Sequence, residues 1–420
     1  MNIINTITSD NFNKTIFDNG LSVVSEFVPS INSFSAGICV NIGSRNDWRG
    51  KEGIAHFMEH SAFRHTQNRN SKQIANAFEN LGAYSNAFTT KELTFFYVRA
   101  ITQHFVKTFE LLADITMNTI FIEKEIEKEK LIILEEIKSY EDDPEEYICD
   151  LADTLVFAGT PLAPPIIGFQ NSVTDIKYTD LRDFHSKLYQ PQNITIAVAG
   201  NIEHSAIIDA VSKYFPDVQN ERNIETAPTI QPIPIPYLSV NKDIQQAHLM
   251  LSTNTKGIRN DERYCLAVAN VMFGEGMSSR LYQNLREKHG LAYSIYSSIQ
   301  NYIDCGAWSI YVATDEKKVG QTIELILKEM EKFRETKKPT MREIERAKEQ
   351  LKTATIIELE SMSSRMQNLI KQEVSIGKYE TIPEIIASID SITLEDVSAL
   401  ATTYFNPTLW CRCLLLPDSE

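Results

Sequence analysis

The stretch LGAYSNAF at residues 81–88 returns in altered form as GLAYSIYS at residues 290–297. Three further pairs follow in the same order along the chain: 95–115 with 308–330, 123–130 with 341–348, and 189–200 with 404–416. The two members of each pair are separated by about 210 to 218 residues. Matches at one nearly constant spacing are the sequence signature of a repeated unit, so we predict that the chain is a duplication of one domain.

A proline-rich stretch, NIETAPTIQPIPIPY, divides the chain almost in half at residues 223–237. Its prolines disfavour both a helix and a central strand, and such a composition is typical of an extended linker. A chain of 420 residues is also too long for one ordinary core. We therefore expect two homologous domains, at residues 1–222 and 238–420, joined by the linker 223–237.

Each half contains the same kinds of predicted elements. Residues 35–44 and 248–253 are rich in β-formers and are expected to be strands. In the first half a helix over part of 53–66, an alternating strand region, two long helices and a closing strand at 194–200 follow. The expected fold class is α+β, with two homologous domains that each consist of a mostly antiparallel sheet with helices packed on it.

Composition excludes some classes of function. The net charge of −15 makes nucleic acid an unfavourable partner, because binding it depends on neutralising phosphates with Lys and Arg. No run approaches the roughly 18 apolar residues of a membrane helix. The start, MNIINTITSDNFNKTIF, lacks the basic and apolar segments of a secretion signal, so we expect a cytoplasmic protein. A mature form whose targeting segment had been removed would read the same.

Residues 53–66, GIAHFMEHSAFRHT, hold three of the eight histidines. His56 and His60 are four apart, which puts both imidazoles on one face of a helix, within reach of a single ion. Glu59 is one turn from His56 and can reach a water on that ion. The pattern H-x-x-E-H reverses the commoner zinc-protease H-E-x-x-H. By itself the motif also fits a core helix with two hydrogen-bonded histidines, and we expect His65, outside the pair, to be a hydrogen-bonded structural histidine.

A third ligand is expected in the segment 122–143, IEKEIEKEKLIILEEIKSYEDD. Wound as a helix, it has one apolar stripe, which consists of Ile122, Ile126, Ile133, Ile137 and Tyr140. Glu129 and Glu136 fall in the same arc, and buried carboxylates are costly unless something positive meets them. A zinc ion meets one, and the ring N–H of a metal-bound histidine meets the other. The alternative is a helix tilted so that both glutamates reach solvent.

The prediction is therefore one Zn²⁺ per chain, bound by His56, His60 and Glu136. Glu59 is the expected general base, acting on a water that zinc makes easier to ionise. Glu129 is expected to accept a hydrogen bond from a ligand histidine. This chemistry is metal-assisted hydrolysis, and the expected substrate is a peptide bond.

These residues resemble the pitrilysin/insulinase family of zinc metallopeptidases, in the branch of the mitochondrial processing peptidase and its bacterial relatives. The matching segments span essentially the whole chain: GIAHFMEHSAFRHT, LGAYSNAFTTKELTFFY, EIEKEKLIILEEI, GTPLAPPIIG and GEGMSSRLYQNLREKHGLAYSIYS. The spacing from His60 to Glu136 is within the family's range. In two places the chain departs from the family pattern: His65 replaces the glycine of FKGT or FRGT, and TPLAPP lacks the usual histidine and arginine.

The resemblance implies a catalytic, zinc-binding N-terminal domain and a C-terminal domain that has lost the metal ligands. Two identical chains, or one chain and a related partner, would close like a clamshell around a chamber that holds the peptide. The strand near Asn86 and Ala87 would bind the substrate in extended form. Arg286 and Tyr293 match a pair that holds the substrate carbonyl at the zinc site of the opposite subunit. Without the resemblance they read as a surface arginine and a core tyrosine.

Two rival interpretations differ in function class. The first is a catalytically silent structural or binding subunit of a heterodimeric peptidase, since the family includes members without the zinc motif. It is disfavoured because every expected ligand is present. The second is a small lyase with the same H-x-x-E-H, but such chains are about one domain long and use a cysteine near the metal. None of the six cysteines lies near either ligand segment, and the duplication argues against it.

Overall fold

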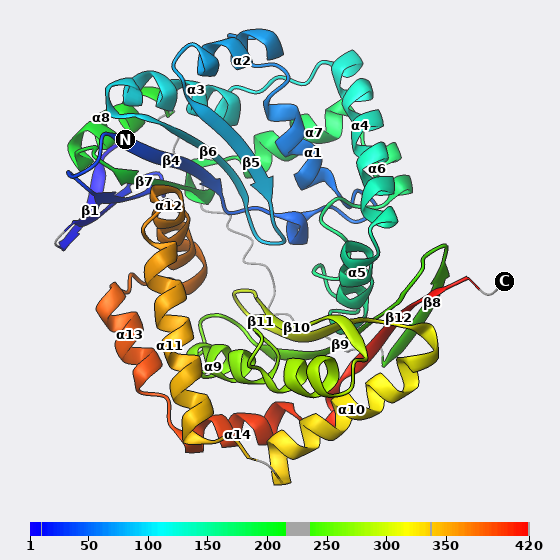
Figure 1. The fold of residues 1–420 in the computed structure, drawn as a ribbon. Helices are drawn as coiled ribbons and strands as arrows, with labels where there is room; N and C mark the ends of the chain where they lie inside the picture. The colour runs from blue at the N-terminus through cyan, green and yellow to red at the C-terminus, as the bar shows by residue number, and fades with distance from the viewer. Residues whose placement is uncertain (10, 216–235, 337, 419–420) are drawn as a thin grey trace. The chain divides into compact units, whose positions relative to one another are not determined.

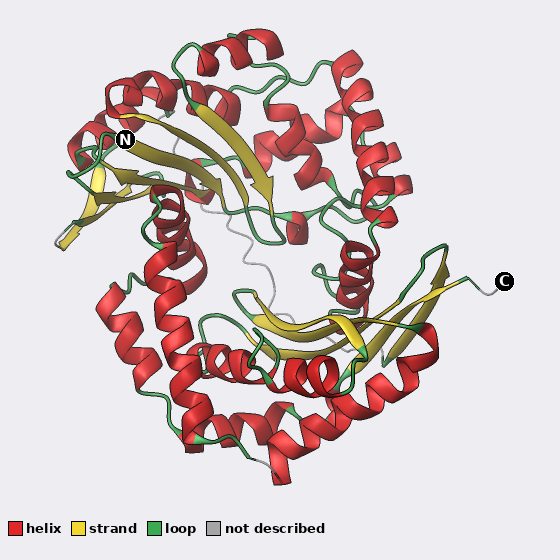
Figure 2. Cartoon of the chain, in the orientation of Figure 1, coloured by secondary structure: helices red, strands yellow, loops and turns green. Residues whose placement is uncertain are grey.

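The computed structural model describes residues 1–9, 11–215, 236–336 and 338–418 (Figure 1). Two sheets, shown in yellow in Figure 2, each form the centre of one compact unit. The predicted linker, 223–237, lies almost entirely outside the described residues, and its last residue, Tyr237, begins a strand. Among the described residues no helix is long and apolar enough to cross a membrane.

The first sheet has seven strands in the order β1-β2-β3-β7-β4-β6-β5. Their bounds are Ile3–Ser9 (β1), Phe12–Phe17 (β2), Ser22–Phe27 (β3), Ser33–Val40 (β4), Tyr84–Thr89 (β5), Thr94–Ile101 (β6) and Ile194–Gly200 (β7). All neighbours are antiparallel except β3 and β7. The central strand β7, ITIAVAG, is buried along its whole length, as expected for a strand covered on both faces.

The second sheet has five strands in the order β10-β11-β9-β12-β8. They are Tyr237–Lys242 (β8), Ala247–Lys256 (β9), Ala292–Asn301 (β10), Cys305–Thr314 (β11) and Cys411–Pro417 (β12). Read from its other end, β8-β12-β9-β11-β10, this order repeats β3-β7-β4-β6-β5, and the one parallel pair occupies the same place in both. The predicted α+β fold of two homologous, mostly antiparallel sheets is confirmed.

Most helices of the first unit cover one face of its sheet. They include Ile54–Ala62 (α1), Ser71–Glu79 (α2), Phe105–Met117 (α3), Glu123–Asp142 (α4), Gln170–Asp175 (α6), Tyr178–Leu188 (α7) and His204–Tyr214 (α8). Their apolar sides and the sheet share one core, in which Phe34, Phe57, Phe96 and Phe109 are fully buried. This core fixes α1 against the sheet, which matters because α1 carries the histidine motif.

The second unit has an equivalent helical layer. It consists of Arg263–Phe273 (α9), Val319–Glu331 (α10), Met341–Glu358 (α11), Ile382–Asp390 (α13) and Leu394–Tyr404 (α14), with a π-helix at Tyr282–Lys288 (η4). Trp308, Phe273, Phe333 and Phe405 lie in the core between this layer and the sheet. Shorter turns of 3₁₀ or π-helix occupy Ser44–Asn46, Thr102–His104, Pro191–Asn193, Glu316–Lys318, Lys332–Thr336, Lys371–Ile376 and Pro407–Leu409.

One additional helix covers the other face of each sheet. Helix α12 (Met362–Ile370) packs on β3, β4 and β7, and α5 (Pro144–Val156) packs on β9 and β12. Under α12, Met366, Leu369 and Ile370 are buried against the first sheet. Under α5, Cys411 and Cys413 of β12 are both buried in one core, because residues two apart in a strand point to the same face of the sheet.

The two compact units therefore do not follow a single cut of the chain. The first combines Met1–Lys138, the described residues from Pro164 to 215, and Glu358–Tyr379. The second combines Ser139–Ala163, the described residues from 236 to Ile357, and those from Glu380 onward. The predicted domains, 1–222 and 238–420, are halves defined by the repeat, and they stay a prediction. Helices α5 and α12 each pack in the unit that is built mainly from the other half.

Gly37, in the middle of β4, shows how closely α12 approaches the sheet. A Cβ at this position would lie 2.2 Å from Cζ of Phe95 and 3.2 Å from Sδ of Met366. The absence of a side chain here lets the Phe95 ring and the Met366 thioether fill the space over β4. Met366 itself has no exposed surface.

We expect Met366→Ala to lower the free energy of unfolding by about 2–5 kcal/mol, because it removes a buried side chain and leaves a cavity over Gly37. Urea and thermal unfolding followed by circular dichroism measure the change. Met341→Ala is the matched control: this methionine is 52% exposed, so its loss should change stability by less than about 0.5 kcal/mol. Equal effects of the two substitutions would contradict the assigned packing of α12.

Candidate metal centre

The start of helix α1 is fixed by Gly53 and Asp47. Gly53 has φ 95°, and a Cβ there would lie 2.4 Å from the carbonyl oxygen of Ile167, so only glycine fits. The Asp47 carboxylate accepts hydrogen bonds from the amides of Gly53 (2.6 Å) and Ala55 (3.1 Å). These bonds satisfy donors that a helix start leaves unpaired and set the position of the turn that carries His56.

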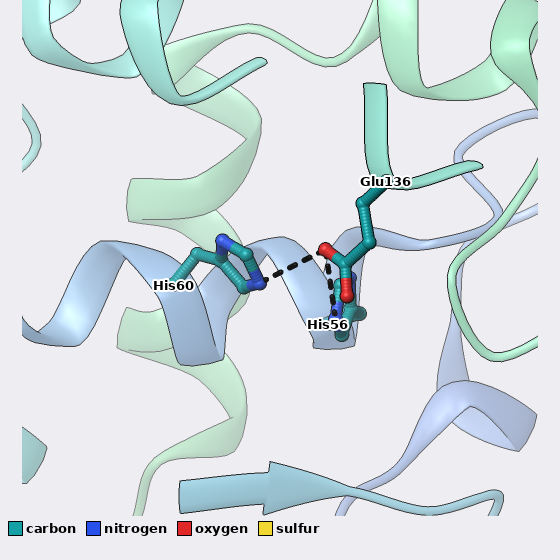
Figure 3. Close-up of side chains that lie close together, drawn as sticks. All are labelled: His56, His60 and Glu136. Carbon is teal, nitrogen blue, oxygen red and sulfur yellow. Dashed lines mark ion pairs between the residues drawn. The ribbon is translucent and has the colours of Figure 1, made fainter. Parts of the chain in front are cut away.

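His56, His60 and Glu136 converge, with one potential ligand atom of each within 4.8 Å of the others. Oε2 of Glu136 lies 4.0 Å from Nε2 of His56 and 3.5 Å from Nε2 of His60, as the dashed lines in Figure 3 mark. Within the part of the chain that the structure describes, no other group of three or more His, Cys, Asp or Glu side chains converges in this way. The three residues that the sequence analysis selected as ligands are thus brought together.

Helix α4 presents Glu129 and Glu136 toward α1. Ile126, Ile133 and Ile137 are buried, as the apolar stripe predicts. The stripe is shorter than predicted, because Ile122 and Tyr140 are 38% and 41% exposed. They lie in the first and last turns of the segment, beyond the core that the middle of the helix contacts. Glu129 is 2% exposed, whereas the side chain of Glu136 is 32% exposed at the edge of the stripe.

The buried carboxylate of Glu129 joins the two helices. It accepts a hydrogen bond from Nδ1 of His60 (2.8 Å) and another from Nε of Arg64. Burial alone would raise the pKa of Glu129, but these two partners outweigh it and hold the pKa below its usual value. Because Nδ1 of His60 donates to Glu129, Nε2 is the nitrogen left to face Glu136. The sequence analysis predicted Glu129 as an acceptor from a ligand histidine but missed Arg64.

The two histidines differ in their electrostatic surroundings. Burial, helped by the neighbouring His60, lowers the pKa of His56 to about 3, so this imidazole is neutral at ordinary pH. For His60 burial acts in the same direction, but the bond to Glu129 and the charge of Glu136 outweigh it and raise the pKa. Surroundings that favour a proton on His60 also favour a metal cation at the same place.

Glu59 is half-buried on α1, and its Oε2 accepts a hydrogen bond of 2.6 Å from the Thr89 hydroxyl. Burial raises the pKa of Glu59, and the bond from Thr89 and the charge of His60 reduce this effect without cancelling it. A carboxylate with a raised pKa is suited to take up and return a proton. Thr89 was not identified from the sequence, because nothing local marks a threonine at a strand end as a partner of a distant glutamate.

His65 lies outside the convergent group. Its Nδ1 is 3.4 Å from Oε2 of Glu125, and neither of these buried atoms has a hydrogen-bond partner among the described residues. The hydrogen bond that was expected for His65 is therefore not formed by Nδ1 among the described residues.

Strand β5, which carries Asn86 and Ala87, is the last strand of the first sheet and pairs only with β6 among the described residues. The side chain of Asn86 is exposed and that of Ala87 is buried. The outer edge of β5 presents backbone groups that can pair with an added strand, where the Ala87 amide now donates a hydrogen bond of 2.9 Å to Oδ1 of Asn86.

Arg286 and Tyr293 belong to the second unit, on η4 and β10. The guanidinium carbon of Arg286 lies 6.0 Å from the centre of the Tyr293 ring, so the two are neighbours. Tyr293 is 77% exposed, which rules out the alternative of a core tyrosine. Their role at a metal centre stays a prediction.

Comparison with known proteins gives matches along most of the chain. Residues 22–169 match the model of insulinase (peptidase family M16), and residues 175–351 match that of the peptidase M16 inactive domain. The uncharacterized zinc protease YmxG of Bacillus subtilis is 34% identical over 92% of this chain and 94% of its own length. An uncharacterized zinc protease of Rickettsia felis is also 34% identical, over 94% and 96% of the two chains.

Two solved structures share the fold. A protease from Helicobacter pylori superimposes with a TM-score of 0.87 at 22% identity, over 97% of this chain and 99% of the other. A peptidase M16 inactive domain from Pseudomonas fluorescens gives 0.88 at 20% identity, over 98% and 99%. At these identities the likeness concerns the duplicated two-domain fold alone.

We expect Glu129→Gln to weaken Zn²⁺ binding by roughly 10–100-fold, because the amide cannot replace the charged partner of His60 and Arg64. Competition with a chromogenic chelator measures the dissociation constant. Glu135→Gln, on the same helix with a side chain that is 73% exposed, is the control and should bind zinc like the unmodified protein. Unchanged affinity in Glu129→Gln would show that this carboxylate does not support a metal ligand.

Proposed function

Because the chain belongs to the insulinase family, peptidase family M16, we propose that it is a zinc-dependent endopeptidase that cleaves unfolded peptides or oligopeptides. The observation that carries the proposal is the convergence of His56, His60 and Glu136, with ligand atoms within 4.8 Å of one another. Relatives named zinc proteases support the metal and the reaction class.

The donor set fits one zinc ion per chain. Two imidazole nitrogens and one carboxylate are a set that catalytic zinc uses in hydrolases, with a fourth position for water. The formal charges of the surrounding side chains also fit a divalent cation. The carboxylates of Glu59, Glu129 and Glu136 outnumber the guanidinium of Arg64 by two, so a divalent cation balances the group.

Bound zinc would polarise the scissile carbonyl and make a water molecule easier to ionise. The carboxylate of Glu59 accepts a proton from the attacking water and returns it to the departing amine nitrogen, so the base is restored at the end of the reaction. Glu129 holds His60 in the tautomer that leaves Nε2 free. The outer edge of β5, at Asn86 and Ala87, pairs with the backbone of the substrate, which requires an extended and therefore unfolded peptide.

We further propose that two copies of the chain, or this chain and a related subunit, enclose the peptide in a clamshell chamber. In this assembly Arg286 and Tyr293 would hold the substrate carbonyl at the metal centre of the opposite subunit. The exposure of Tyr293 supports this assignment, as does the nearness of the Arg286 guanidinium to its ring. Both groups are available on the second unit for contact with a peptide.

Replacing the general base tests the reaction. We expect Glu59→Gln to lower the cleavage rate of a peptide library by about 10²–10⁴-fold, since the amide cannot accept the water proton, while Zn²⁺ stays bound. Glu79→Gln, at the exposed end of α2, is the control and should cleave normally.

Chelation of the metal should abolish cleavage in both the unmodified protein and the control variant. Cleavage that persists in the presence of the chelator and without Glu59 would contradict the proposal and indicate a contaminating protease. Peptide binding without any cleavage, by the zinc-loaded protein, would favour the alternative of a catalytically silent binding subunit.

A mixing experiment tests the proposed homodimer. His60→Ala and Arg286→Ala should each be inactive alone. An equal mixture should recover about a quarter of the unmodified activity, because half of randomly formed dimers are mixed and each mixed dimer has one intact site. Sedimentation and affinity tags on the two chains verify the mixed dimers. No recovery in verified mixed dimers would exclude this role of Arg286.

A further inference from the structure

Thr89 stands out as the partner of the proposed general base. Its hydroxyl donates to Oε2 of Glu59 at 2.6 Å, and among the described residues no other hydrogen bond reaches that carboxylate. We propose that Thr89 is a positioning residue that fixes the orientation of Glu59 for proton transfer. The proposal rests on the proposed peptidase function. Among the described residues the Thr89 hydroxyl bonds to Glu59 and to none of the three metal ligands.

A hydrogen bond to one oxygen restricts the rotation of a carboxylate group. A carboxylate has two acceptor oxygens, and the bond from Thr89 occupies one of them. The other, Oε1, is then the oxygen left to take the proton from the attacking water. Holding a reacting group in one geometry supplies a large part of an enzyme's rate, because small misplacements slow proton transfer strongly.

The Thr89 hydroxyl lies where the end of β5 and the turn after it are held by hydrogen bonds. Thr89 is the last residue of β5 and pairs with Thr94 of β6. In the turn that follows, the Thr90 hydroxyl accepts hydrogen bonds from the amides of Glu92 (3.2 Å) and Leu93 (3.1 Å). The carbonyl of Thr90 accepts from the amide of Ser44 at 3.0 Å, which ties the turn to the segment before α1.

The same strand is the one proposed to pair with substrate. Thr89 and Ala87 are two apart in β5, so their side chains leave the same face of the sheet, the face against which α1 packs. The backbone edge of β5 is left for the peptide. A peptide added to this edge is therefore aligned along the strand whose Thr89 hydroxyl bonds to Glu59. The same strand then positions both the scissile bond and the general base.

The experiment compares Thr89→Val, which keeps the shape but loses the hydroxyl, with Thr89→Ser, which keeps it. We expect Thr89→Val to lower kcat for peptide cleavage by about 10- to 100-fold with KM nearly unchanged. Thr89→Ser should restore most of the rate. The unfolding temperature and the zinc dissociation constant, measured on the same samples, should be those of the unmodified protein.

A second comparison separates positioning from a general structural role. In the Glu59→Gln background, adding Thr89→Val should cause no further loss, because residues that act as a unit are not additive. A rate equal to that of the unmodified protein in Thr89→Val would overturn the inference, as would a full additional loss in the double variant. If Thr89→Val does not fold, Thr89→Ala against Thr89→Ser makes the same comparison.

Failure of this inference is distinguishable from failure of the proposed function. Without chelator-sensitive cleavage by the unmodified protein, the peptidase proposal itself fails. With such cleavage present and Thr89→Val fully active, only the role of Thr89 fails.

Discussion

The bond between Glu129 and His60 joins two helices that are far apart in the sequence. It is formed by a nearly inaccessible carboxylate on α4 and an imidazole on α1, with Arg64 on the other carboxylate oxygen. Glu136 follows Glu129 by two helical turns and so shares its face. Once Glu129 is held by His60, the register of α4 against α1 is set, and Glu136 comes to the histidine pair. The convergence of the three potential metal ligands depends on that register.

The glutamates of the site differ in their surroundings, and these differences suit them to different roles. Three glutamates lie close together, but their partners differ. Glu129 has two positively charged or donating partners, which keep its pKa low. Among the described residues Glu59 accepts one hydrogen bond, from the neutral hydroxyl of Thr89, and burial raises its pKa despite this bond and the charge of His60. Carboxylates whose environments separate their pKa values in this way are suited to different roles, one as a fixed structural anion and the other as a proton acceptor.

Much of this arrangement could be predicted from the sequence, because periodicity is a local property. The four-residue spacing of His56 and His60 and the stripe on α4 needed only helix geometry. The repeat predicted two similar sheets, and the second sheet does repeat the strand order of five strands of the first. Arg64 and Thr89 could not be found in the same way. Each matters through one contact with a residue distant in the chain, and neither stands at a position whose spacing signals it.

The packing of α5 and α12, each on the sheet built mainly from the other half of the chain, could not be predicted from the sequence either, for a different reason. Both are short amphipathic helices, and the apolar face of such a helix fits any sheet of suitable curvature. Each covers the sheet built mainly from the opposite half, as Met366 does over Gly37. A product that held only one half of the chain would therefore lack the helix that covers one face of its sheet, and its own exchanged helix would have no sheet to cover.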